Sequence, residues 1–293
     1  MTDTASNTNK SVMIYAFITV ILWASAFVFT KVALVNFTPE SLGAVRYLFA
    51  SILLIAFAVI KKISLPSIRD IPIFFLAGFT GFSFYIYAFN EGSVSLSAST
   101  SSILISTVPI ITAVLAMIFY KEKINKICWL AIGIEFLGII IIAVNNGVFA
   151  INRGVNWMMG AAVSFAIYNM LQRRILKKYT SLQSTTYSIF AGTILLGIFL
   201  KDGLIQLYKA PTLQILNVAC LGFLPGAIAY LIWMAAMSKT KKVTTVTNFM
   251  FITPLLSTIM GLIIIKEIPS FITIVGGCII VGGSILFQML NTK

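Results

Sequence analysis

The side chains of this chain offer little material for covalent chemistry. Its 293 residues include no His, so imidazole is absent as a metal ligand, catalytic base or pH switch. Cys128, Cys220 and Cys278 stand singly in apolar runs, without the spacing of a metal site or a disulfide framework. Hydrolysis or group transfer needs a base, a metal cluster or a carboxylate pair. The sequence therefore argues against an enzyme and predicts no metal and no cofactor.

One acid, Glu135, lies in the middle of a long apolar run. Ala131 and Gly138, at i−4 and i+3, share its helix face, and such small neighbours indicate packing on protein rather than on lipid. Because an ionisable group in hydrocarbon is costly, Glu135 is a candidate proton carrier. The alternative is a neutral, hydrogen-bonded side chain at a helix contact or subunit interface.

Three further ionisable residues lie near the ends of apolar runs. Lys31 and Arg46 have side chains long enough to snorkel toward the headgroups. Glu91, at the end of the third run, is a candidate partner for either of them and a second candidate proton carrier. Snorkelling or helix tethering remains the simpler interpretation of the two basic residues.

Most neutral polar side chains cluster in four apolar runs, at about 70–90, 95–119, 213–237 and 243–265. Lipid would leave their hydrogen-bonding groups unsatisfied, so they should face inward. Many would form hydrogen bonds between helices. Because a proline bends a helix and frees a carbonyl, we take as candidate binding residues those a turn or two before Pro109 and Pro254, namely Ser102, Ser106, Thr247 and Asn248.

Several aromatic residues with a polar group lie within the apolar runs rather than at their ends. Aromatic walls with dispersed hydrogen-bonding groups are typical of a small-molecule cavity. The candidate wall residues of such a cavity are Trp23, Ser25, Tyr85, Tyr168, Asn169, Tyr230 and Trp233.

The overall composition indicates the elements that must position these residues. Hydrophobic residues make up 59% of the chain and charged residues 10%, against about 25% charged in soluble domains. We therefore predict an all-α integral membrane protein after a disordered tail, 1–11. Its ten transmembrane helices fall at about 12–35, 40–60, 70–90, 95–119, 124–145, 155–176, 182–200, 213–237, 243–265 and 270–290.

The net charge of +13 follows the loops between these spans. With ten spans, fifteen Lys and Arg residues fall on the side of both termini and five on the other, while Arg46 lies within a span. Positive residues favour the cytoplasmic side, so we expect a multi-pass protein of the cytoplasmic membrane with both termini in the cytoplasm. The charge is thus an orientation signal, and no nucleic-acid partner is expected.

The two halves of the chain look like copies of one another. A shift of 145 positions aligns Tyr85 with Tyr230 and Pro109 with Pro254, as well as Lys121-Glu122 with Lys266-Glu267. The sequence thus predicts two repeats, 12–146 and 154–290. Each holds five spans, an odd number, so the second enters the membrane from the opposite side. Inverted repeats around a central cavity are typical of secondary transporters.

The chain resembles the ten-helix EamA type of the drug/metabolite transporter superfamily. The resemblance covers about residues 12–290 and rests on these motifs: Trp23-Ala24-Ser25, Arg46, Ser97-Ala98, Ser102-Ile103-Leu104, Pro109, Glu122, Gly138, Arg173-Arg174, Trp233, Ala236, Pro254, Gly261, Glu267, Gly276-Gly277 and Gly282-Gly283. It implies a cavity formed by spans 1, 3, 4, 6, 8 and 9, and export or exchange of small metabolites, often amino acids. Lys31 and Arg46 match positions where the family carries basic residues, so the resemblance makes each a candidate gate or carboxylate contact. The substrate is not fixed by it.

The leading hypothesis is a secondary transporter that moves small neutral or zwitterionic metabolites outward by alternating access. Amino acids and related amphipathic compounds are the expected cargo, since few fixed charges fall in the predicted cavity. A multidrug or lipophilic-cation exporter and a facilitative metabolite exchanger are the alternatives. A receptor or scaffold is disfavoured, because soluble domains and long loops are lacking. The coupling ion and the oligomeric state, monomer or homodimer, stay open.

Overall fold

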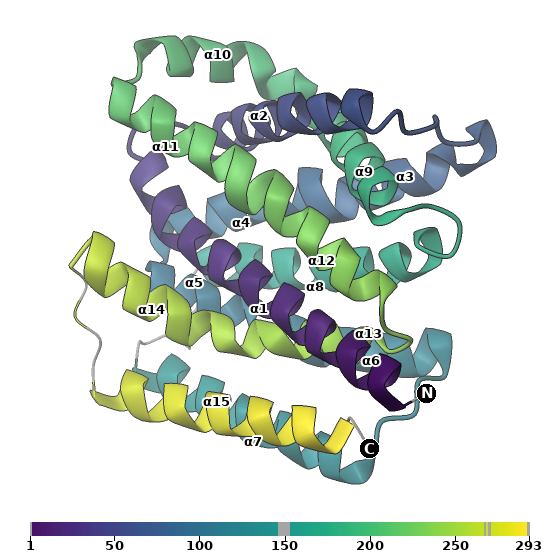
Figure 1. Ribbon diagram of the computed structural model, residues 1–293. Helices are drawn as coiled ribbons and strands as arrows, with labels where there is room; N and C mark the ends of the chain where they lie inside the picture. Colours follow the sequence, from purple (N-terminus) through teal and green to yellow (C-terminus); the bar gives the residue numbers. More distant parts are fainter. Residues whose placement is uncertain (1, 146–152, 267, 269–270, 292–293) are drawn as a thin grey trace.

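The computed structural model describes the chain except residues 1, 146–152, 267, 269–270 and 292–293, and the described part is all helical, without strands (Figure 1). The first half contains α1 (Thr2–Ala33), α2 (Pro39–Ile60), η1 (Ile68–Asp70), α3 (Ile71–Gly78), η2 (Phe79–Ser83), α4 (Phe84–Ser95), α5 (Ala98–Ile105), α6 (Val108–Tyr120) and α7 (Lys126–Asn145). The second contains α8 (Arg153–Ile175), α9 (Ser181–Leu196), η3 (Gly197–Phe199), α10 (Leu200–Lys209), α11 (Thr212–Phe223), η4 (Leu224–Ile228), α12 (Ala229–Ser238), α13 (Val243–Thr247), η5 (Asn248–Ile252), α14 (Thr253–Ile264) and α15 (Phe271–Asn291).

Seven helical segments of the described chain are long and apolar enough to cross a membrane. They are Lys10–Ala33, Pro39–Ile60, Ile68–Ser95, Ala98–Tyr120, Ser181–Lys209, Thr212–Ser238 and Val243–Ile264. The prediction of an all-helical membrane protein is therefore confirmed at this level. Helix α1 also includes most of the residues that the sequence assigns to a tail. Glu267, and residue 146 at the end of the first predicted repeat, lie outside the described residues.

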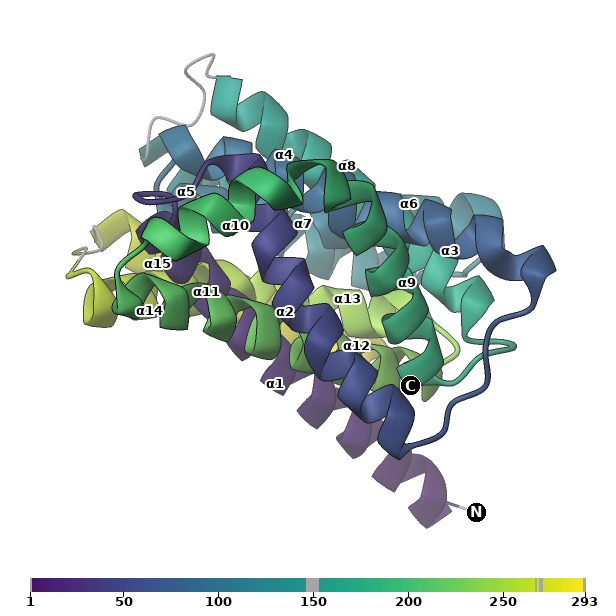
Figure 2. The same cartoon turned by 90° about the horizontal axis from the view of Figure 1, so that it is seen from above.

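The helices form a bundle in which the long α1 crosses the face nearest the viewer in Figure 1, packed against α12 and α14. Helix α8 packs against α4 and α6 in its turn. Helices α7 and α15 lie side by side at one edge of the bundle, whereas α2, α10 and α11 lie at the opposite edge. Figure 2 shows the same arrangement from above, with α2 against α9. The centre of the bundle is therefore bounded by α1, α4, α8 and α12.

Two of the spanning segments are interrupted by a π-helical turn at the same relative position. These turns, η2 and η4, begin 145 residues apart. A π turn disturbs the regular i→i−4 ladder, and such turns are frequent at functional sites. Ser164 donates its hydroxyl to the carbonyl of Thr80 at 2.7 Å, and Trp23 donates its Nε1–H to the carbonyl of Pro225 at 3.2 Å. Each π turn thus offers its second carbonyl to a side chain of a distant helix.

Two other segments change helix type before a proline. Helix α6 begins again at Val108 after two residues of turn, and α14 follows the 3₁₀ segment η5. Ser257 donates to the hydroxyl of Ser102 at 2.6 Å, and Ser106 lies 3.3 Å from the carbonyl of Met250. Hydroxyl groups therefore join the two interrupted segments where their helical ladders are weakest.

The crossing of α3 and α9 depends on paired glycines. A Cβ atom on Gly192 would lie 2.5 Å from the Cβ of Phe82 and 2.9 Å from the carbonyl oxygen of Gly78. Neither contact is tolerated between real atoms, so a side chain at Gly192 must push the helices apart. Small residues of this kind permit close packing of membrane helices.

We predict that Gly192→Ala destabilises the protein by about 1–3 kcal/mol through overpacking. The measurement is the apparent unfolding free energy in detergent micelles. The matched control is Gly133→Ala, also inside a helix, where an added Cβ would meet nothing within 4 Å. Equal stability of the two variants would contradict the glycine-dependent crossing.

Candidate functional site

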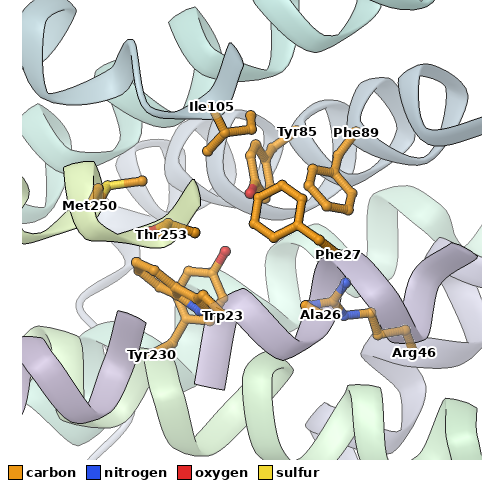
Figure 3. Close-up of a pocket in the computed structure, with 10 residues that line it drawn as sticks. All are labelled: Trp23, Ala26, Phe27, Arg46, Tyr85, Phe89, Ile105, Tyr230, Met250 and Thr253. Atoms are coloured by element: carbon orange, nitrogen blue, oxygen red, sulfur yellow. The ribbon is translucent and has the colours of Figure 1, made fainter. Parts of the chain in front are cut away.

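A small cavity lies at the centre of the bundle, between α1, α4 and α12 (Figure 3). Its volume is about 20 Å³, enough for about one water molecule. Ten residues line it: Trp23, Ala26, Phe27, Arg46, Tyr85, Phe89, Ile105, Tyr230, Met250 and Thr253. They come from α1, α2, α4, α5, α12, η5 and α14, so the cavity joins both halves of the chain.

Aromatic rings form most of the cavity wall. The ring of Trp23 lies 5.1 Å from that of Tyr230 and 4.8 Å from that of Trp233, measured between centroids. Phe27 and Phe89 meet edge to face at 5.1 Å on the other side. Figure 3 shows the hydroxyl groups of Tyr85 and Tyr230 directed into the space between these rings. The wall is therefore apolar with two phenolic groups that can hydrogen-bond a solute.

Arg46 brings the only charged side chain to this wall among the described residues. The residue is 4% exposed, and its Nε is buried without a hydrogen-bond partner. Its guanidinium lies 5.7 Å from the ring centroid of Tyr47, and it belongs to no ion pair within the described chain. A buried cation without a protein counter-charge is electrostatically incomplete, since a buried charge is normally paired. An anionic group is the ligand chemistry that would complete this arrangement.

Trp23, Tyr85, Tyr230 and Arg46 are the predicted site residues that the structure brings together on the cavity wall. Asn169 and Trp233 lie behind it. Trp233, fully buried, donates its Nε1–H to the Oδ1 of Asn169 at 3.0 Å.

The remaining candidate binding residues do not line the cavity. Tyr168 is buried against Phe165, with ring centroids 5.5 Å apart. Ser25 donates to the carbonyl of Leu22, and Thr247 donates to that of Val243, both within their own helices. Ser102 and Ser106 take part in the contacts between the two interrupted segments. The interpretation as hydrogen bonds between helices therefore fits Ser102 and Ser106, whereas the hydroxyls of Ser25 and Thr247 bond to the backbone of their own helices.

Glu135 is fully buried and lies against the first residue of η5. Asn248 donates its side-chain amide to Oε1 of Glu135 at 3.1 Å. Two residues further along η5, Met250 lines the central cavity. The contact thus connects a carboxyl on α7, outside the cavity wall, to a segment that forms part of that wall.

The other predicted gate residues lie near the ends of helices. Lys31, in the last turn of α1, donates its Nζ to the carbonyl of Ser93 at 2.9 Å. Glu91 is half-buried near the end of α4. Lys31 therefore ties α1 to the end of α4.

Sequence reasoning missed six of the ten lining residues, of which Phe27, Phe89, Ile105 and Met250 are large and apolar. Their side chains resemble those of the ordinary hydrophobic core, and no polar group distinguishes them. A signal existed for Phe27 and Phe89, because they lie one turn after Trp23 and Tyr85 on the same helix faces.

A charged cluster lies outside the central cavity, where α6, α8 and α13 meet. Arg173, in the last turn of α8, lies 3.5 Å from Oε1 of Glu122 and 4.4 Å from the ring centroid of Tyr120. The carboxylate of Glu122 also faces the backbone amides of Val243 and Thr244 at the start of α13. Burial raises the pKa of Glu122, and the positive charge of Arg173 opposes that rise. The cluster holds α6, α8 and α13 together.

The profile of the EamA-like transporter family matches two parts of the chain, residues 10–144 and 152–289. The chain belongs to this family. The two matches together cover nearly the whole sequence. The protein is therefore a multi-pass membrane transporter rather than an enzyme.

Known relatives cover most of this EamA-like transporter. It is 36% identical to an uncharacterized transporter of Bacillus subtilis, YdfC, over 89% of this chain and 86% of that one. It is 29% identical to a probable terminal-alkyne amino-acid exporter of Streptantibioticus cattleyicolor, over 92% and 91% of the two chains. A crystal structure with 17% identity superposes with a TM-score of 0.76, covering 96% of this chain and 99% of that chain. That likeness concerns the fold alone.

We predict that Glu122 and Arg173 are energetically coupled. Each single substitution, Glu122→Gln or Arg173→Gln, leaves one partly buried charge without its partner. The double variant should therefore lose less stability than the sum of the losses of the two single variants. The expected coupling is about 1 kcal/mol in a double-mutant cycle of unfolding free energies in micelles. Glu122→Gln combined with Lys61→Gln is the control pair, for which additivity is expected. Additive losses for Glu122 and Arg173 would contradict the contact.

Proposed function

We propose that the chain forms ten transmembrane helices in two inverted five-helix repeats, which present the central cavity alternately to each side. The two family matches support this arrangement. The distance of 145 residues between the starts of η2 and η4 also supports it, because it equals the shift that aligns the two halves of the sequence. So does the exchange of partners between the halves: α1 packs on α12 and α14, as α8 packs on α4 and α6. Lys121 and Lys266, 145 residues apart, both adopt a left-handed backbone conformation.

The proposed cargo is a small amphipathic metabolite with a carboxylate, an amino acid or a close relative. The observation that carries this proposal is the buried guanidinium of Arg46 on an otherwise apolar and aromatic wall. Guanidinium and carboxylate form charge-assisted hydrogen bonds, which are strong where water is excluded. Trp23, Tyr85 and Tyr230 would then enclose the apolar part of the solute. The name of the Streptantibioticus relative, an amino-acid exporter, supports the same class.

We place the transporter in the cytoplasmic membrane, with both termini in the cytoplasm and with outward transport. The excess of Lys and Arg in the loops on the side of the termini supports the orientation. A lipophilic-cation exporter is the weaker alternative, since Arg46 would repel a cation and no acidic residue lines the described cavity. A facilitative exchanger differs in coupling alone and uses the same site.

Binding requires the helices to part, because the cavity has room for about one water molecule. In the proposed cycle we take this arrangement as the closed form. The π turns at η2 and η4, together with the interruption at η5, are the places where the helical ladder is already irregular.

We predict that Arg46→Gln lowers the apparent affinity for the transported amino acid by about tenfold or more, because the carboxylate loses its counter-charge. The assay is counterflow in proteoliposomes with the twenty amino acids and the corresponding amino-acid amides. The wild type should accept the acid and reject its amide, whereas Arg46→Gln should lose this discrimination. Arg46→Lys should restore part of it.

The matched control is Arg153→Gln, the same change at an exposed position at the start of α8. It should discriminate between acid and amide as the wild type does. Equal transport of acid and amide by the wild type, or transport of lipophilic cations in their place, would contradict the proposed cargo.

We further propose that Glu135 carries the coupling proton. Its complete burial and its hydrogen bond to Asn248 support this role. We predict that Glu135→Gln keeps counterflow, since a Gln carbonyl can still accept from Asn248, but abolishes accumulation driven by an imposed pH gradient. Glu91→Gln tests the second candidate in the same vesicles. Gradient-driven accumulation by Glu135→Gln at the wild-type level would show that Glu135 is a packing residue.

A further inference from the structure

A second, larger hollow lies outside the central cavity, between α3, the end of α8 and the turn before α9. Its volume is about 430 Å³. The lining residues are Arg69, Asp70, Pro72, Ile73, Leu76, Leu171, Arg174, Ile175, Lys178 and Tyr179. None of them lines the central cavity, so the groove is a separate feature of the transporter. We refer to it as the α3–α8 groove.

The α3–α8 groove has an excess of positive charge. Lys178 and Tyr179 both hydrogen-bond the carboxylate of Asp70, and this contact raises the pKa of Lys178. Asp70, the one acid that lines the groove, is thus paired with Lys178. Arg69 and Arg174 are exposed and belong to neither ion pair of the described chain. Two guanidinium groups therefore remain available to a ligand.

The same groove continues into an apolar surface. Ile73 and Leu171 lie deeper along its walls, and Leu76 is 49% exposed. Ile68, Leu76 and Phe79 are exposed large apolar residues on α3 and its flanking turns, and Leu76 and Phe79 are three positions apart. Arg69 precedes the apolar stretch of α3, and Arg174 lies in the last turn of α8, so both charges sit at helix ends. Charge at the helix ends and apolar surface along the helices match the two parts of a phospholipid.

We propose that the α3–α8 groove binds an anionic phospholipid. The headgroup phosphate pairs with Arg69 and Arg174, and the acyl chains lie along Ile73, Leu76 and Leu171. Basic pockets between transmembrane helices on the cytoplasmic side are suited to such headgroups. A lipid held in this way connects the start of α3, the helix that leads into η2, to the end of α8. The apolar surface that continues from the two guanidinium groups favours a lipid over the transported solute, whose short apolar part would be enclosed in the central cavity.

The test uses the full-length transporter, delipidated in detergent, with phosphatidylglycerol or phosphatidylcholine of identical acyl chains. Bound lipid is counted by native mass spectrometry, and the melting temperature is recorded alongside. We expect preferential binding of phosphatidylglycerol and a raised melting temperature. Arg69→Gln/Arg174→Gln should weaken that binding about thirtyfold, as two basic residues near an anionic headgroup would contribute. Arg69→Lys/Arg174→Lys should retain most of it.

The matched control is Lys61→Gln/Lys241→Gln, which removes two exposed positive charges from the same predicted side of the membrane but outside the groove. It should bind phosphatidylglycerol as the wild type does. Wild-type binding by Arg69→Gln/Arg174→Gln, or equal binding of the two lipids, would overturn the proposal. So would the same rise in melting temperature with inorganic phosphate alone, which would assign the charges to a free anion. Displacement of the lipid by a counterflow substrate would instead make the groove an entrance for cargo.

Discussion

Backbone polar groups inside a membrane must find partners within the protein, and the structure meets this constraint most visibly at its two π turns. The carbonyls of Thr80 and Pro225 accept hydrogen bonds from Ser164 and Trp23, residues of distant helices. An irregular turn within a membrane-spanning segment is tolerated because a neighbouring helix supplies the hydrogen-bond donor. The aromatic wall depends on the same contact, since the indole that satisfies Pro225 also lines the cavity. Rotation of the Trp23 ring away from the cavity therefore exposes a buried carbonyl.

The buried cation imposes a second constraint on the cavity. Arg46 lies on α2 where Gly222 lets α11 approach closely: a Cβ on Gly222 would lie 2.6 Å from the carbonyl oxygen of Arg46. This close crossing leaves little space for water around the guanidinium. A charge in such surroundings attracts a counter-charge more strongly than it would in water. Under the proposed function, this crossing would strengthen the attraction of Arg46 for a carboxylate without touching the solute.

The sequence predicted those features that a residue type or a repeat makes visible. Tyr85 and Tyr230 align at the shift of 145, and both line the cavity. Arg46 was recognised because charge within an apolar run is rare. Gly81 in η2 and Pro225-Gly226 in η4 mark a weakened helical ladder, but they do not specify a π turn, whose second carbonyl accepts from a residue of α8 or α1. Likewise, the side chains of Ser102, Ser106 and Asn248 were expected to face the interior and bind a solute. They do lie in the interior, but they form hydrogen bonds with other helical segments.

The position of Asn248 shows why residue type alone does not separate a binding group from one that transmits a change. Its amide faces Glu135 on α7, away from the cavity, while Met250 and Thr253 on the same short stretch face the cavity. A 3₁₀ segment has poorer hydrogen-bond geometry than an α-helix, so it changes conformation at lower cost. The carbonyl of Met250 is held from the other side by Ser106. Segment η5 is therefore fixed between a carboxyl on α7 and a hydroxyl at the end of α5. If Glu135 carries the coupling proton as proposed, its change in charge would act on the cavity wall through this single short element.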